Sequence, residues 1–332
     1  MTVLITGGAG YIGSHAVLAF REAGYEVVVV DNLATGHRDA VPAEVPFIKC
    51  DVGDLQRVQE TIQAHGITTV IHFAGSLIVP ESVEKPLAYY LNNTAASRNL
   101  VEVCVKTGVR HFIFSSTAAV YGIPERLPIA ETAPTEPINP YGRSKLMTEW
   151  ILNDAAAAHR LGVVALRYFN VTGADPEGRT GQSTPNATQL VKVASEAATG
   201  LRDEVIIFGQ DYDTPDGTCI RDYIHVTDLV DAHVRALRYL EAGGESQVLN
   251  CGYGHGFSVI EVLDKVQEVS GANFVIRTGP RRPGDPPEVF ADVSRIRDVL
   301  PWRPSHDDLT EMVASTVRWE NALARKQHFK AS

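Results

Sequence analysis

The first 170 residues alternate short runs of apolar, often β-branched residues with stretches whose apolar residues recur at helical spacing. We predict strands at 2–6, 26–31, 46–51, 68–75, 111–117 and 162–170, and helices at about 12–23, 54–65, 86–107 and 140–160. Strands that are apolar on both faces are typical of a parallel sheet that helices cover on both sides. The alternation therefore predicts an α/β fold with a Rossmann-type, doubly wound parallel sheet.

The regular alternation ends near residue 171. Residues 171–185 and 277–288 are rich in Gly, Pro, Thr or Arg, and we expect both to be long loops. Further helices are expected near 186–199, 226–242, 257–270 and 307–325, and further strands near 205–208, 247–250 and 273–277. We expect residues 1–170 to form one domain and 171–332 a smaller α/β substrate-binding lobe, with some segments returning to the main sheet.

Composition excludes several classes of function. The net charge of −10 argues against nucleic acid or anionic membranes as partners. The four cysteines are far apart and show no metal-ligand spacing, so we expect neither disulfides nor a metal site. No apolar run reaches the roughly 18 residues of a membrane span, and the N-terminus enters a strand without a signal-peptide pattern. We therefore expect a soluble, cytoplasmic protein.

A glycine-rich turn follows the first predicted strand. Gly8, Gly10 and Gly13 have the G-x-G-x-x-G spacing that lets a pyrophosphate approach the N-terminus of the next helix. Asp31 ends the next strand, where a carboxylate binds a ribose diol and repels a 2′-phosphate, which favours NAD over NADP. Asp51 ends the strand after that. It is equally well read as an adenine contact or as a helix N-cap.

A candidate catalytic pair begins the helix expected at 140–160. Tyr141 and Lys145 are four residues apart and so share one helix face. A lysine beside a phenol favours the phenolate and is expected to lower the tyrosine pKa, which would give a general base near neutral pH. The Y-x-x-x-K spacing alone is a weak motif. It gains weight from the glycine turn and from Ser115, Ser116 and Thr117 at the end of a predicted strand.

Nine segments carry a family resemblance: GGAGYIGSH, DNLATG, VIHFAG, ESVEKPLAYYLNN, FIFSSTAAVYG, NPYGRSKLMTEWIL, LRYFNVTGA, GTCIRDYIHVTDL and RRPGD. Together they make the chain similar to the UDP-glucose 4-epimerases, an extended family within the short-chain dehydrogenase/reductase superfamily. The likeness runs over essentially the whole chain in order. It implies NAD-dependent interconversion of UDP-galactose and UDP-glucose through oxidation at C4, rotation of the 4-keto intermediate and re-reduction.

The resemblance also implies residue roles. Tyr141 would accept the 4-hydroxyl proton and return it, Lys145 would tune Tyr141 and hold the nicotinamide ribose, and Thr117 would hydrogen-bond the 4-oxygen. The implied NAD contacts are Gly7, Gly10, Tyr11, Ile12 and Gly13 at the phosphates, Asp31 and Asn32 at the ribose, Asp51 and Val52 at adenine, and Phe73, Ala74, Gly75, Asn92, Ser115 and Tyr168 along the cleft, with Tyr141 and Lys145. Ser116 is expected to be structural.

On the substrate side the resemblance implies Asn170 and Arg221 for phosphate and sugar, Arg282 for the diphosphate, Asp285 for the uridine ribose, Phe208 for uracil, and Gln189 and Leu190 in a uridine-binding helix. Thr117 and Tyr141 complete this set. The competing interpretation of Arg221 is an ion pair with a neighbour such as Asp222. The resemblance further implies a homodimer, paired through helices near 90–106 and 141–158.

Three positions depart from the family pattern. Leu77 stands where known members have a lysine, and Gln189 stands where an asparagine is common. Val289 replaces a bulky tyrosine of some members, which should enlarge the pocket near the sugar C2. We therefore hypothesise some tolerance for UDP-N-acetylhexosamines.

Several other functions are known for proteins with these motifs. A 4,6-dehydratase of the same superfamily needs an added acid and base, usually Asp-Glu directly after the threonine, and this chain has Ala118 and Ala119 there. A UDP-GlcNAc 4-epimerase is a close alternative, and a UDP-uronate 4-epimerase or a decarboxylase would want a cation for the C6 carboxylate. A non-catalytic NAD-binding regulator is disfavoured because Tyr141, Lys145 and Thr117 are all present.

Overall fold

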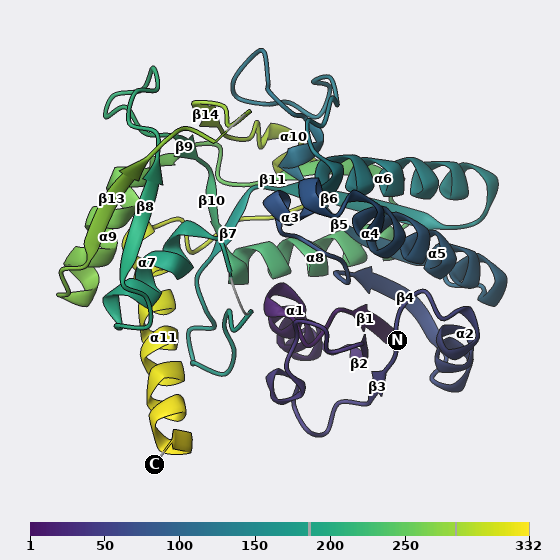
Figure 1. The fold of residues 1–332 in the computed structure, drawn as a ribbon. Helices are drawn as coiled ribbons and strands as arrows, with labels where there is room; N and C mark the ends of the chain where they lie inside the picture. Colours follow the sequence, from purple (N-terminus) through teal and green to yellow (C-terminus); the bar gives the residue numbers. More distant parts are fainter. Residues whose placement is uncertain (185–186, 283, 332) are drawn as a thin grey trace.

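A seven-stranded parallel sheet forms the centre of the molecule (Figure 1). The computed structural model describes residues 1–184, 187–282 and 284–331, with side chains up to residue 325. The sheet order is β11-β6-β5-β4-β1-β2-β3. The strands are β1 (Thr2–Thr6), β2 (Glu26–Asp31), β3 (Phe47–Lys49), β4 (Ile67–His72), β5 (His111–Thr117), β6 (Gly162–Tyr168) and β11 (Gln247–Cys251). This confirms the predicted Rossmann-type α/β fold.

Helices cover both faces of this sheet because successive strand residues point to opposite sides. Val3 and Ile5 belong to the hydrophobic core under α1 (Tyr11–Glu22) and α8 (Val226–Glu241). Leu4 belongs to the second core, on the opposite face. The helices over that second core are α2 (Leu55–Ala64), α5 (Ala96–Thr107) and α6 (Pro140–Ala158).

The helix expected over 86–107 is interrupted. The chain forms α3 (Val79–Glu84), α4 (Pro86–Tyr89), a π-helical turn η2 (Tyr90–Ala95) and then α5. The carbonyl oxygen of Asn93 accepts hydrogen bonds from the hydroxyls of Ser97 and Thr148, at 2.5 and 3.1 Å. These side-chain donors stabilise the widened turn, and an apolar periodicity does not reveal them.

Smaller sheets build the rest of the chain. The strands are β7 (Asn170–Thr172), β8 (Glu204–Phe208), β9 (Ile220–Arg221), β10 (Tyr223–His225), β12 (Phe257–Ser258), β13 (Val275–Gly279) and β14 (Glu288–Val289). They pair as β10-β7, β12-β9-β14 and β13-β8. The helices are α7 (Leu190–Ala198), α9 (Val259–Ser270), α10 (Ser294–Val299) and α11 (Leu309–Ala331), with short 3₁₀ turns η1 (Arg38–Ala40) and η3 (Ala118–Val120) elsewhere.

Six of these elements differ from the sequence expectation. Strands β7 and β14 lie partly in stretches expected to be loops, and β12 lies at the start of an expected helix. Strands β9 and β10 and helix α10 were not anticipated. The strands are only two or three residues long, and their pairing partners are distant in the chain. Such short elements have no local periodicity from which they could be predicted. Part of the helix expected at 186–199 lies outside the described residues, and α7 begins at Leu190.

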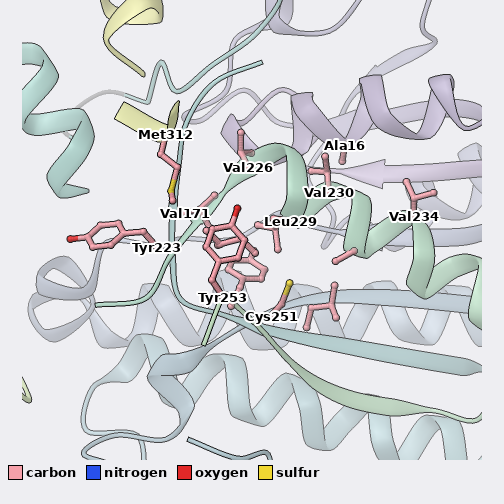
Figure 2. Close-up of a cluster of buried hydrophobic side chains, with 14 of the residues drawn as sticks. Ala16, Val171, Tyr223, Val226, Leu229, Val230, Val234, Cys251, Tyr253 and Met312 are labelled. Atoms are coloured by element: carbon pink, nitrogen blue, oxygen red, sulfur yellow. The ribbon is translucent and has the colours of Figure 1, made fainter. Parts of the chain in front are cut away.

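A buried cluster joins the main sheet to the later elements (Figure 2). It includes Ala16 on α1, Val230 on α8, Cys251 on β11, Tyr223 on β10 and Met312 on α11. Strand β11 itself pairs with β6 in the main sheet although it comes late in the chain. The domain boundary at residue 170 stays a prediction, because the core runs across it.

The sheet order fixes where a ligand site is expected. The chain winds outward from β1 through β2 to β3 on one side and through β4 to β5 and β6 on the other. The crevice outside the carboxyl ends of β1 and β4 is therefore the topological switch point, where doubly wound folds bind ligands. Among the described helices, none has the length and apolarity needed to cross a membrane.

Candidate active site

One cavity of about 1530 Å³ opens at this switch point. Its wall combines the carboxyl ends of the main-sheet strands with α7, β8 and the segment that leads into β14. Every site residue predicted from the sequence lines it: Gly7, Gly10, Tyr11, Ile12, Gly13, Asp31, Asn32, Asp51, Val52, Phe73, Ala74, Gly75, Asn92, Ser115, Thr117, Tyr141, Lys145, Tyr168, Asn170, Gln189, Leu190, Phe208, Arg221, Arg282, Asp285 and Val289. Its volume exceeds the usual range for a single ligand and suits a cofactor with a substrate.

The glycine turn between β1 and α1 is packed tightly on itself. Gly7 has a φ of 71°, and a Cβ there would lie 2.6 Å from the backbone nitrogen of Ala74. A Cβ on Gly13 would lie 2.0 Å from the carbonyl oxygen of Gly7. At Gly10 a Cβ would meet nothing nearer than 3.3 Å, so this backbone borders the open cavity. Among the described side chains none caps α1, and its N-terminus lines the cavity.

Asp31 lies at the end of β2, beside this turn. Its buried carboxylate accepts hydrogen bonds from the backbone nitrogens of Ala9 at 2.9 Å and Leu33 at 2.8 Å. Each oxygen keeps a further lone pair for a ligand hydroxyl. An exposed helix N-terminus for a pyrophosphate and a carboxylate for a ribose diol together fit a dinucleotide without a 2′-phosphate.

Asp51 is not the N-cap of the next helix. Asp54 caps α2, with its side chain accepting from the backbone nitrogen of Arg57. Asp51 instead accepts from Asn32 Nδ2 at 3.1 Å and from the backbone nitrogen of Gly53 at 2.8 Å. The N-cap alternative is therefore wrong, and Asp51 stays a candidate adenine contact.

Tyr141 and Lys145 are placed by the start of α6. The Asn139 side chain accepts from the backbone nitrogen of Gly142 at 2.8 Å, and Pro140 occupies the first turn. Lys145 Nζ donates to the carbonyl oxygen of Ser115 at 2.9 Å. Thr117 follows on the same strand, and its hydroxyl is a hydrogen-bond partner of the Tyr141 phenol. The strand end and the helix therefore bring the predicted trio together.

The pKa of Tyr141 departs from the sequence expectation. Burial raises the pKa of Tyr141, and the hydrogen bond with Thr117 opposes that rise. Burial also lowers the pKa of Lys145 to about 8, while the charge of Glu149 acts in the other direction. The expected lowering at Tyr141 took account of the neighbouring lysine but not of the desolvation of the phenol, which dominates here. At neutral pH Lys145 is still mostly an ammonium ion.

Three predicted contacts along the cleft form hydrogen bonds with hydroxyl groups. The Ser115 hydroxyl and the Tyr168 phenol form a hydrogen bond between β5 and β6. Asn92 Nδ2 donates to the hydroxyl of Ser76 at 2.8 Å, on the turn after β4. Leu77 lies on the same turn and lines the cavity, and no described lining residue from 76 to 84 is a cation. Nothing on this segment replaces the lysine of the family.

The predicted substrate residues are paired with one another. Arg221 forms an ion pair with Asp285, and not with Asp222. Asp222 instead accepts from three backbone nitrogens, those of Tyr253, Gly254 and Ala291. The competing interpretation correctly predicted an ion pair for Arg221, but the partner is Asp285 and not Asp222.

Arg282 lies over the ring of Phe208, with Cζ 3.9 Å from the ring centroid. Phe208 is the residue that was expected to pack on uracil. Stacking of a guanidinium on an aromatic ring keeps both groups at the cavity wall. The two arginines and their partners Asp285 and Phe208 therefore form one cluster of predicted substrate contacts at the cavity.

The wall beyond Thr117 is uncharged. Ala118, Ala119, Gly122, Ile138 and Asn139 line the cavity there. Val289 packs with Ala118 and Phe169 against the small core around Val120. Among these described residues no group offers a proton or a positive charge to a C6 substituent.

One buried polar cluster beside the site was not predicted from the sequence. Glu149, one turn after Lys145, is buried and bonds to Ser116 and Arg167. A signal for it existed, since Tyr141, Lys145 and Glu149 recur at intervals of four on one helix face. A carboxylate on that buried face requires a partner, which the sequence does not identify.

Comparisons with known proteins agree with this geometry. Residues 3–252 match the model of the NAD dependent epimerase/dehydratase family. The chain is 57% identical to the UDP-glucose 4-epimerase of Azospirillum brasilense over 97% of this chain and 92% of that one.

Two solved structures are also similar. A UDP-glucose 4-epimerase from Bifidobacterium longum in complex with NAD⁺ and UDP has a TM-score of 0.91 at 38% identity, covering 97% of this chain and 98% of that one. A UDP-Glc/GlcNAc 4-epimerase from Campylobacter jejuni has a TM-score of 0.85 at 48% identity, covering 97% and 99%.

Proposed function

The chain belongs to the NAD dependent epimerase/dehydratase family, and on this premise we propose that it interconverts UDP-galactose and UDP-glucose as an NAD-dependent UDP-glucose 4-epimerase. The observation that carries the proposal is the meeting of Thr117, Tyr141 and Lys145 in the cavity that the glycine turn also lines. The test is incubation with each UDP-hexose separately. Both incubations should reach the same ratio of the two sugars, and failure to convert either one would refute the proposal.

We assign NAD to the part of the cavity nearest the glycine turn. Backbone groups of residues 10–13 would hold the phosphates, Asp31 and Asn32 a ribose, and Asp51 with Val52 the adenine. Phe73, Ala74, Gly75, Asn92, Ser115 and Tyr168 would border the nicotinamide end with Lys145. When bound, NAD⁺ would supply a hydride acceptor and a positive ring.

The proton chemistry is assigned to Tyr141. Its phenolic oxygen would accept the proton of the substrate 4-hydroxyl and later return it to the 4-oxygen. Thr117 would donate a hydrogen bond to that oxygen as it becomes a ketone and then an alkoxide. The ammonium of Lys145 favours the phenolate against the effect of burial, which raises the pKa of Tyr141.

The UDP moiety is assigned to the other end of the cavity. Forked guanidinium groups suit a diphosphate, and Arg221 and Arg282 are the candidates there. Uracil would pack on the ring of Phe208, which Arg282 contacts on one face. Asp285 would bind the uridine ribose, so its ion pair with Arg221 would weaken or break when the substrate binds. Asn170, Gln189 and Leu190 complete the proposed contacts.

The uncharged wall supports an epimerase over the other reactions considered. A 4,6-dehydratase needs an acid and a base beside C5 and C6, and Ala118 and Ala119 provide neither. A uronate epimerase or decarboxylase needs a cation for the C6 carboxylate, and the described wall from 118 to 139 has none at the cavity. The complete trio of Tyr141, Lys145 and Thr117 disfavours a regulator without turnover.

We also propose a side activity on UDP-N-acetylhexosamines, because Val289 lines the cavity with Ala118 and Phe169 and is smaller than the tyrosine of some family members. UDP-GalNAc should be turned over with a kcat/KM within about 100-fold of that for UDP-galactose, since a lost or gained small group in an apolar pocket changes specificity by roughly that factor. Val289→Tyr should lower kcat/KM for UDP-GalNAc at least tenfold more than that for UDP-galactose. A wild-type kcat/KM for UDP-GalNAc many orders below that for UDP-galactose would refute this side activity.

We also propose a homodimer whose interface includes α4, η2 and α6. Leu87 on α4 is 80% exposed and Leu91 on η2 is 70% exposed, one turn apart, and Trp150 on α6 is 55% exposed. Exposed apolar side chains gathered on adjacent helices are typical of an interaction surface. Light scattering should give twice the mass of one chain, and Leu87→Glu with Leu91→Glu should give a folded monomer. A monomeric wild type would rule the dimer out.

We place the reaction in the cytoplasm. All four cysteines are free, as expected where thiols are kept reduced. Galactose catabolism and the supply of polysaccharide precursors use the same reaction, and both are compatible with this site.

A further inference from the structure

Glu149 joins three elements of the active site at one carboxylate. It lies on α6 one turn after Lys145 and is 2% exposed. One oxygen accepts from the Ser116 hydroxyl and from Arg167 Nε at 3.0 Å, and the other accepts from an Arg167 terminal nitrogen at 2.6 Å. Ser116 and Arg167 face each other across β5 and β6. The carboxylate therefore ties α6 to the ends of both strands.

Those strand ends carry the groups that surround the proposed base. Ser115, just before Ser116, accepts from Lys145 Nζ through its carbonyl oxygen. Thr117, just after Ser116, is the hydrogen-bond partner of Tyr141. Glu149 holds the residue between these two contacts. A shift of Ser116 would therefore displace the Lys145 and Tyr141 partners together.

The charge of Glu149 also acts on Lys145. Two titratable groups interact with the charge of Lys145, namely Glu149 on α6 and His72 on β4, and the Phe114 ring of β5 lies 5.0 Å from Nζ. Tyr141 and Tyr168 line the same cavity as Lys145, and Arg167 bonds to Glu149. Burial lowers the pKa of His72 to about 3, so it is neutral at working pH. Burial raises the pKa of Tyr168, which stays protonated. Glu149 therefore supplies the negative charge that acts on Lys145, and the guanidinium of Arg167 partly neutralises that charge.

Resting on the proposed function, we propose that Glu149 is a positioning residue for the epimerase reaction. It fixes the 115–117 strand end against α6, and its negative charge keeps the buried Lys145 in the ammonium form that Tyr141 needs. Glu149 touches neither substrate nor cofactor in this role. Its effect passes through Ser116 to Thr117 and through the field at Lys145.

A role in stability alone is the alternative to exclude. The chain offers a matched control in Glu320, a buried carboxylate on α11 whose partner is Lys192 at 2.6 Å. Removing either charge takes a carboxylate partner from a buried cation and should destabilise the fold, although Lys192 keeps an ion pair with Glu196 at 3.2 Å. Loss of stability therefore cannot distinguish the two roles, whereas the titration of Lys145 can.

The test compares pH–rate profiles for UDP-galactose, with products separated by chromatography. In Glu149→Gln the alkaline limb of kcat should move at least one pH unit lower, because Lys145 then loses the negative charge that opposes the effect of burial on its pKa. KM should change less than kcat. Glu149→Asp keeps the negative charge but shortens the side chain. Its kcat should therefore fall, while the alkaline limb of its pH profile should stay at the wild-type pH. Glu320→Gln should leave the limb in place while lowering the melting temperature.

A second readout does not depend on turnover. NMR of ¹⁵N-lysine protein, with the Lys145 signal assigned by its loss in Lys145→Met, should show Lys145 titrating lower in Glu149→Gln. Should that variant not fold, Glu149→Gln with Arg167→Met removes both charges, and its Lys145 titration should still lie below wild type. An unchanged Lys145 titration overturns the inference. A wild type that titrates as expected but converts no UDP-hexose refutes the proposed function and leaves the Lys145 field intact.

Discussion

Tyr141→Phe should lower kcat for UDP-galactose by about 10²–10⁴-fold, the usual contribution of a positioned general acid–base. The substitution removes one oxygen from a buried ring that hydrogen-bonds Thr117. Lys145 remains bonded to Ser115, so the surrounding backbone should keep its place. The loss should therefore appear in kcat, with bound NAD retained and KM within a few-fold of wild type. Initial rates from quenched samples, together with the NAD content of the purified variant, measure both.

Tyr121→Phe is the matched control. Tyr121 is buried in the turn that follows β5, and its hydroxyl donates to Asn250 Oδ1 at 2.7 Å, away from the proposed reacting groups. Its loss should cost about 1 kcal/mol of stability and little activity. A Tyr141→Phe variant whose kcat stays within tenfold of wild type would mean that another group handles the proton.

Gly13→Ala should abolish stable NAD binding and destabilise the fold by about 3 kcal/mol or more, the upper end of the usual cost of overpacking. The new Cβ would lie 2.0 Å from the Gly7 carbonyl oxygen and 2.8 Å from the Gly8 Cα. Both atoms are backbone and cannot rotate away. The glycine turn would have to open, which removes the backbone arrangement assigned to the pyrophosphate. NAD per chain after purification and the melting temperature should both fall.

Gly10→Ala separates the two effects. Its Cβ would meet only the Gly7 carbonyl oxygen, at 3.3 Å, so the fold should remain near wild-type stability. The methyl group would nevertheless border the cavity where the cofactor is assigned. NAD should therefore bind more weakly in a protein that melts almost as wild type does. Undiminished NAD binding in both variants would place the cofactor elsewhere.

The sequence predicts the main sheet well because its signals are local. Each β-branched run, such as 26–31, is a strand buried on both faces. The glycine spacing is recognisable because the turn leaves no room for a Cβ at Gly7 or Gly13. The site residues could be predicted because they follow strand ends, which a parallel sheet gathers at one edge. Family resemblance added the residues of the later segments, which local patterns do not connect to the sheet.

What the sequence does not predict depends on contacts between distant segments. The π-helical turn at 90–95 depends on hydroxyls from Ser97 and Thr148. The pairing of Arg221 with Asp285 spans 64 residues. The direction of the Tyr141 pKa depends on burial that a helix-face argument does not contain. In each case tertiary structure decides a contact or a pKa that local sequence patterns do not contain.

The most direct test of the central claim uses UDP-galactose that carries deuterium at C4. UDP-glucose should form with the deuterium retained at C4, because the carbon-bound hydrogen is removed and returned within the cavity while only the hydroxyl proton passes through Tyr141. NMR of the product reads both its configuration and its label. Absence of UDP-glucose, or UDP-glucose with hydrogen from water at C4, would contradict the account.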